Sequence, residues 1–248
     1  MYTAYNMDTT SLRPIEKREL KYRETAYAAI KEAILSGQLA PDKPLVEEQL
    51  AAILHTSRTP VREALAILEH EGLISPRGGR GLYVRSLTRQ EFVEIFVANE
   101  IVEPDLVRRA ARLVTDEDLH VIAETISRGR FHAAQSDLPR FLQAGREFHR
   151  LIGVAAENGP LTRFIVQNQE RADLYLLGAG KSMSVEAMQA SNDQHEAILD
   201  AIVRRDPDEA ARLAVVHAHS TREHLASLFS DEEEGQGKET DQIDEVYG

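Results

Sequence analysis

Apolar residues recur at every third or fourth position along most of the 248-residue chain, which is the pattern of amphipathic helices. In the first part of the chain, glycine, proline and small polar residues divide this pattern into short segments. The elements expected there are a helix at residues 22–36, a turn at residues 39–44, a helix at residues 46–54, and a third helix from about Ser57 to Gly72.

The third helix has an apolar face and a basic start. Ser57 or Thr59 can cap it, and Pro60 suits its first turn, where a missing N–H costs nothing. Arg58 and Arg62 lie off the apolar face, which consists of Val61, Ala64, Leu65 and Leu68. A helix with arginines at its N-terminal end fits a major groove of DNA, where phosphates and guanine edges accept hydrogen bonds. The alternative is an ordinary surface helix with scattered charge.

A glycine-rich hairpin follows this helix. Residues 73–75 and 82–84 read as two strands, and the residues between them include Arg77-Gly78-Gly79-Arg80-Gly81. Arginines around such a turn can contact phosphates or a neighbouring minor groove, although a plain hairpin with exposed arginines remains possible. Helix and hairpin together have the organisation of a winged helix-turn-helix. The residues expected to bind DNA are Ser57, Arg58, Thr59, Arg62, Gly79 and Arg80.

From residue 87 onward, the pattern predicts helix after helix and no convincing strand. Thr88 and Glu91 form a capping-box pair at the first of these helices. The six expected helices span residues 88–113, 115–134, 138–156, 161–178, 184–205 and 207–229. The fold class is therefore mainly α, an N-terminal winged helix-turn-helix followed by a C-terminal antiparallel bundle of six or seven helices. The expected divisions are a flexible arm at 1–20, the winged helix-turn-helix at 21–86, the bundle at 87–230, and a disordered acidic tail at 231–248.

Three histidines are expected to face the interior of this bundle. His149, His195 and His217 each lie on the apolar or small-residue stripe of a different predicted helix. A lone inward histidine is more often a hydrogen-bonded core residue than a metal ligand. Imidazoles on facing helices can nevertheless converge on one transition-metal ion, so the spacing alone leaves both interpretations open.

The charge of the chain is distributed unevenly. The formal net charge is −12, but residues 1–87 carry 12 Lys and Arg against 11 Asp and Glu, a balance of +1. Residues 231–248 carry 1 against 8, so the acid lies away from the predicted DNA-binding residues. The chain has no cysteine, no apolar run of about 20 residues and no signal-peptide pattern, and we expect a cytoplasmic protein.

Residues 22–85 resemble the winged helix-turn-helix of the GntR family of bacterial transcription regulators. The resemblance rests on Val46-Glu47-Glu48-Gln49-Leu50-Ala51, on the nine residues from Ser57 to Leu65, and on Leu68-Glu69 and Glu71-Gly72-Leu73-Ile74. It implies that Arg58 and Arg62 contact the operator and that the wing near Gly79 enters the minor groove. His55 and Thr56 replace a usual Gly-Val, so His55 must adopt a left-handed conformation or the turn must shift.

Residues 88–229 resemble the FCD effector domain of the FadR subgroup within the same family. The matching segments are Glu147-Phe148-His149-Arg150-Leu151-Ile152 with Asn158, and the stretch from His195 to Ala210 that leads to His217. In many members an aspartate and three histidines hold a divalent metal, which binds the carboxylate of a small organic acid. The histidines correspond to His149, His195 and His217, whereas Gly145 replaces the aspartate and Asn99 replaces a frequent arginine.

The resemblance implies a homodimeric repressor that reads a palindromic operator and is released by its effector. It implies an effector site at Asn99, Gly145, His149, His195 and His217, and a metal such as Zn²⁺, Ni²⁺ or Mn²⁺ on the histidines. Because Gly145 removes a carboxylate, either the ion has an open coordination position or the imidazoles bind an anion directly. A regulator whose bundle only dimerises is one alternative. A metal-dependent hydrolase is a remote one, because no inward glutamate is placed as a general base, and we expect no enzyme.

Overall fold

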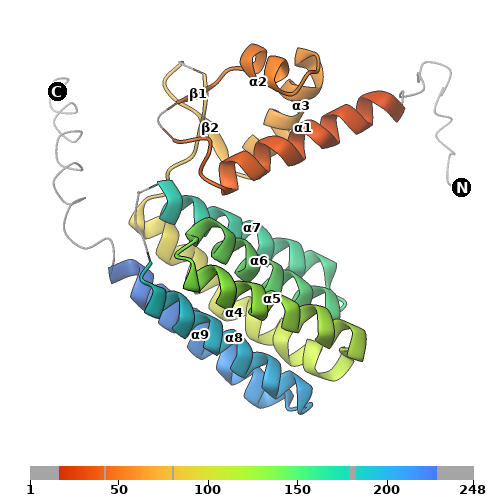
Figure 1. Cartoon of the computed structure of the whole chain (residues 1–248), viewed down its shortest axis with the longest axis vertical. Helices are drawn as coiled ribbons and strands as arrows, with labels where there is room; N and C mark the ends of the chain where they lie inside the picture. The colour runs from red at the N-terminus through yellow and green to blue at the C-terminus, as the bar shows by residue number, and fades with distance from the viewer. Residues whose placement is uncertain (1–16, 42, 80, 179–182, 228–248) are drawn as a thin grey trace, which may run out of the picture.

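The computed structural model describes residues 17–41, 43–79, 81–178 and 183–227 (Figure 1). Its N-terminal part, called the head below, contains three helices and a small antiparallel sheet in the order β1-β3-β2. The elements of the head are α1 (Lys17–Leu35), β1 (Pro44–Leu45), α2 (Glu47–Ile53), α3 (Arg58–His70), β2 (Ile74–Pro76) and β3 (Leu82–Val84).

The remaining part, called the bundle below, consists of helices connected by short segments. Within the described residues these are α4 (Arg89–Leu113), α5 (Asp116–Ala134), α6 (Leu138–Ala155), α7 (Gly159–Gly178), α8 (Val185–Val203) and α9 (Pro207–Ser227). Helix α4 packs beside α9, α5 beside α6 and α8, and α7 beside α4 and α6. The head lies at one end of the bundle, where α1 contacts α7 (Figure 1). No helix in the described part of the chain is long and apolar enough to cross a membrane.

The capping signals and apolar stripes of the sequence appear where they were expected. Thr88 accepts a hydrogen bond from the backbone of Glu91, whose side chain in turn accepts one from the backbone N–H of Thr88. Val61, Ala64, Leu65 and Leu68 of α3 are buried. Ser57 occupies the N-cap position of α3 but makes no capping hydrogen bond with its side chain.

The first strand was not predicted. Pro44 was assigned to a turn and Leu45 to no element, but they pair with Tyr83 and Leu82 of β3. A two-residue strand carries no alternating pattern, and proline is tolerated there because the strand lies at the edge of the sheet. Helix α1 begins at Lys17 rather than at residue 22, so part of the predicted arm is helical. Residues 1–16 and the acidic tail lie outside the described residues.

The turn between α2 and α3 contains a left-handed residue. His55 has a φ of 50°, which is one of the two outcomes expected when histidine replaces glycine there. The N–H of Thr56 donates to the carbonyl of Ala51, and the N–H of His55 donates to the carbonyl of Ala52. These bonds satisfy the last carbonyls of α2, as in a Schellman motif. The departure from glycine therefore preserves the turn.

Replacing Gly153 with alanine is expected to destabilise the protein. The added Cβ would lie 2.5 Å from Oγ1, 2.8 Å from Cγ2 and 2.9 Å from Cβ of Thr162, so rotating the threonine cannot relieve the contact. Helix propensity alone would favour alanine by about 1 kcal/mol, but overpacking costs roughly 1–3 kcal/mol. We expect a lower midpoint in thermal unfolding. Gly145→Ala in the same helix meets only His195 Cε1 at 3.7 Å, and an equal loss in that control would contradict the steric explanation.

Candidate functional site

The start of α3 carries an exposed basic surface. Ser57, Arg58 and Thr59 are exposed, and the side chains of Arg58 and Arg62 are 60% and 62% accessible. Both arginines bind Glu47 at the start of α2. Arg62 donates two hydrogen bonds of 2.9 and 2.8 Å to its carboxylate, and Arg58 donates one of 3.4 Å. The hydrogen bonds from Arg62 are the main cause that holds the pKa of Glu47 below its usual value.

Glu47 was not among the predicted site residues. It lies one helix away from the arginines in sequence, and only the packing of α2 against α3 shows that it lies beside them. The paired carboxylate fixes the direction of the Arg62 guanidinium. Because Arg62 is paired with Glu47, a DNA phosphate or base must either displace Glu47 from Arg62 or bind the guanidinium beside it.

The wing is described in part. Gly79 is exposed with a φ of 71° and open space around it, whereas Arg80 lies outside the described residues. Arg77 places its guanidinium 5.0 Å from the centre of the Tyr83 ring. Arg85, directly after β3, forms an ion pair with Glu91 at the start of α4. Arg85 therefore links the head to the bundle.

The three predicted histidines converge inside the bundle. His149 on α6, His195 on α8 and His217 on α9 are each about 5% exposed. One ring nitrogen from each lies within 4.8 Å of the others, and Nε2 of His195 is 3.1 Å from Nε2 of His217. Burial, followed by the charge of His149, lowers the pKa of His217 to about 4, although Glu103 opposes this shift. Burial, followed by the charges of His217 and His149, lowers the pKa of His195 well below its usual value.

Two side chains outside the triad fix the direction of two of these rings. Nδ1 of His217 donates to Oε1 of Gln194 at 2.8 Å, and Nδ1 of His149 donates to the carboxylate of Glu103. Rings held by Nδ1–H present the lone pair of Nε2 to the space between them. Ligand histidines in metal sites are held in this manner, by a carboxylate or carbonyl oxygen on the far nitrogen. The donor set therefore fits a transition-metal ion.

Glu103 was not among the predicted site residues. It is an inward carboxylate, 4% exposed, in a part of the sequence where no inward glutamate was identified as a general base. Burial alone would raise its pKa, but the neighbouring His149 and His217 outweigh burial and hold the pKa below its usual value. Because Glu103 contacts Nδ1 of His149, it supports that ring from the side opposite Nε2. This position suits an orienting residue rather than a general base.

The two positions that depart from the family pattern both border the same pocket. A Cβ on Gly145 would be 3.7 Å from Cε1 of His195, so this position faces the triad. Asn99 is 1% exposed and accepts a hydrogen bond of 2.8 Å from Asn168, while its own Nδ2 is buried without a partner. A buried amide donor without an acceptor is suited to a polar ligand atom.

The pocket has a cavity volume of about 50 Å³, and the three histidines lie in its wall. Its apolar wall comes from Phe96, Phe141, Leu142, Leu176, Met183 and Leu225. Arg146 and Asp173 also line it and form an ion pair that the sequence did not reveal. Burial raises the pKa of Asp173, and the charge of Arg146 opposes this rise.

Two family profiles match the chain. The bacterial regulatory proteins of the gntR family match residues 22–84, and the FCD domain matches residues 94–225. The Exu regulon transcriptional regulator of Escherichia coli K12 is 30% identical over 235 residues, covering 88% of each chain. The HTH-type transcriptional repressor RspR of the same strain is 25% identical over 202 residues, covering 82% of this chain and 88% of its own.

The HTH-type transcriptional repressor NanR of Cronobacter sakazakii is 28% identical over 230 residues, covering 84% of this chain and 86% of its own. Among solved structures, E. coli McbR/YncC superposes with a TM-score of 0.72 at 20% identity, covering 84% of this chain and 97% of its own, which shows a shared fold. With its winged helix-turn-helix and its helical pocket domain, the chain belongs to the gntR family of bacterial transcription regulators that carry an FCD domain.

Proposed function

We propose that the protein is a cytoplasmic, homodimeric repressor that leaves a palindromic operator when a small organic acid enters the bundle. The observation that carries this proposal is the set of three buried imidazoles presented to a pocket that also contains Arg146. Two of the similar proteins are named as transcriptional repressors. A regulator without a ligand would have little need for a pocket whose wall brings three imidazoles and a guanidinium together.

A divalent ion such as Zn²⁺, Ni²⁺ or Mn²⁺ would be held by His149, His195 and His217. When bound, it would supply a Lewis acid that attracts the carboxylate of the effector. The protein contributes the rest of the site. Asn99 offers an amide donor, and the apolar wall favours an acid that has a hydrophobic body.

On the DNA side, Arg58 and Arg62 would contact bases or phosphates, with Ser57 and Thr59 beside them. The wing around Gly79 and Arg80 would reach the adjacent groove. Two heads on one duplex would compensate for the weak basic balance of each head, since affinity depends strongly on phosphate neutralisation. A dimer with two equivalent heads reads two equivalent half-sites, which predicts the palindrome.

The experiment that tests the proposal combines metal analysis with selection of DNA. Untagged protein is loaded with Zn²⁺, dialysed and analysed for metal, and we expect about one ion per chain. DNA bound from a random-sequence pool is then sequenced, and small organic acids are added to the complex. We expect a palindromic motif and release by at least one acid. A chain that stays free of metal would overturn the proposed metal site. Bound DNA without a shared sequence motif would overturn the proposed recognition of a palindromic operator.

Gly145→Asp is expected to strengthen metal binding. Position 145 lies four residues before His149 on α6, and a Cβ there makes only an ordinary contact of 3.7 Å with His195 Cε1. The substitution adds a hard anionic donor to three neutral imidazoles, so we expect the dissociation constant for Zn²⁺ to fall about tenfold or more. Isothermal titration with Zn²⁺ measures it. Gly145→Ala adds the Cβ without the carboxylate and should bind Zn²⁺ as the wild type does; an equal gain in both variants would contradict the explanation.

A further inference from the structure

Helix α7 lines the pocket with some of its residues and packs against the head with others. Ala172, Asp173 and Leu176 line the pocket, while Leu174, 4% exposed, is part of the hydrophobic core of the head. Glu170, one turn before Leu174, faces α1. A packed helix moves as a rigid unit, so a displacement on its pocket face also displaces its head face.

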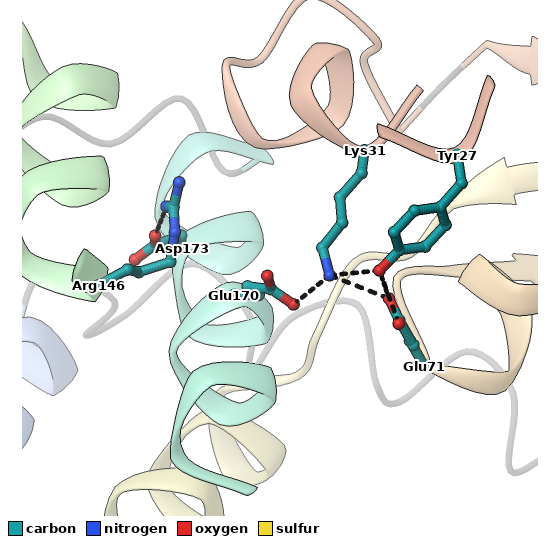
Figure 2. Close-up of polar contacts among 6 residues, drawn as sticks. All are labelled: Tyr27, Lys31, Glu71, Arg146, Glu170 and Asp173. Carbon is teal, nitrogen blue, oxygen red and sulfur yellow. Dashed lines mark hydrogen bonds and ion pairs between the residues drawn. The ribbon is translucent and has the colours of Figure 1, made fainter. Parts of the chain in front are cut away.

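A partly buried lysine joins the head to this helix. Nζ of Lys31 on α1 lies 2.9 Å from the carboxylate of Glu170 on α7 and 3.1 Å from that of Glu71 in the head (Figure 2). Lys31 also donates to the hydroxyl of Tyr27 at 2.7 Å, and this hydroxyl donates to Glu71 at 2.7 Å. The side chains of Lys31, Glu71 and Glu170 are only 17%, 15% and 9% exposed. At this burial the ion pairs are poorly screened by solvent, unlike surface pairs.

The Arg146–Asp173 pair lies less than one helical turn further along α7. Asp173 follows Glu170 by three residues, and Arg146 reaches it from α6 (Figure 2). The positive charge of Arg146 also acts on Glu170. The two neighbouring clusters therefore hold two cationic side chains and three carboxylates, so carboxylates outnumber cations by one. The cations are Arg146 and Lys31, and the carboxylates are Asp173, Glu170 and Glu71. An anion that entered the pocket and accepted hydrogen bonds from Arg146 would compete with Asp173.

We propose that α7 carries the occupancy of the pocket to the DNA-binding head. On the pocket side of α7, the Arg146–Asp173 ion pair responds to an anionic ligand. On the head side of α7, the ion pairs of Lys31 with Glu170 and Glu71 set the position of the head. This inference rests on the proposed function, because it takes the pocket to bind an acid. The two states differ in whether Arg146 is engaged by Asp173 alone or also by the ligand. Lys31 holds the head to α7 and therefore transmits the difference.

The test measures the distance between the head and the bundle in full-length protein. The chain has no cysteine, so Thr25→Cys on α1 and Ala123→Cys on α5, both exposed, take spin labels specifically. The pocket end is altered by Arg146→Gln together with Asp173→Asn, which removes both charges and leaves no buried ion unpaired. The head end is altered by Lys31→Met. Lys21→Met, an exposed lysine on the same helix, is the matched control.

We expect the neutral pair to shift the distance distribution relative to the wild type. Lys31→Met should broaden the distribution, and adding the neutral pair to Lys31→Met should cause no further shift. Lys21→Met should leave the distribution, and its response to the neutral pair, as in the wild type. An unchanged distribution in the neutral pair, or a full shift that persists without Lys31, would overturn the proposal. Metal content and DNA binding of the same samples show separately whether the proposed function holds.

Discussion

Arg62→Ala is expected to lose sequence-specific DNA binding while the protein stays folded and keeps its oligomeric state. The guanidinium is exposed, and its hydrogen bonds go to Glu47 rather than to the core. A bidentate contact between arginine and guanine contributes roughly 1–3 kcal/mol of discrimination, which is about 5- to 150-fold in affinity. Two heads on one operator would double the free-energy loss. Titration of a fluorescent operator selected from the random pool measures the affinity.

Arg108→Ala is the matched control for this variant. Arg108 is a half-exposed arginine on α4 that pairs with the exposed Asp208 on α9, outside the winged helix-turn-helix. Removing it breaks an exposed ion pair of similar kind, which contributes little to stability. We expect this control to bind the operator as the wild type does. If Arg62→Ala keeps full affinity and preference for the operator, α3 is not the reading helix.

The local pattern of the sequence predicted most of the helices. The stripe from Val61 to Leu68 determined the buried face of α3, and Thr88 with Glu91 marked the start of α4. The six bundle helices were all expected, with ends that differ by a few residues. Strand β1 was missed because its two residues are held by pairing with β3, which is remote in sequence. Local patterns carry no information on such pairing.

The same limit explains which site residues were found. The triad could be predicted because each histidine lies on an apolar stripe, and the resemblance to a family identified the same three residues. Glu103, Gln194 and Asp173 are polar positions on long helices, and a charged residue there reads as solvent-facing until the packing of the neighbouring helices is known. The contact between Lys31 and Glu170 joins the head to the bundle and requires the placement of α1 against α7.

His217→Ala is expected to abolish stable metal binding. His217 supplies one of three imidazoles, and its ring is fixed by Gln194 and lies 3.1 Å from Nε2 of His195. Loss of a supporting residue alone typically weakens metal affinity by about 10–100-fold, so the loss of a ligand should exceed this range. Elemental analysis after loading and dialysis should give far less than one ion per chain. Zn²⁺ at 100 times its dissociation constant stabilises a protein by about 2.7 kcal/mol, and this thermal shift should vanish.

His219→Ala separates loss of the ligand from a general effect of removing a histidine from α9. His219 lies two residues further along the same helix, is 57% exposed, and faces Glu100 and Arg222 rather than the triad. This control should retain the metal and the Zn²⁺-dependent rise in unfolding temperature. If His217→Ala retained a full equivalent of metal, the ion would lie elsewhere, and the three imidazoles would be left as donors to an anion or as hydrogen-bonded core residues. Circular dichroism of both variants must match the wild type, because a collapsed bundle would also lose its metal.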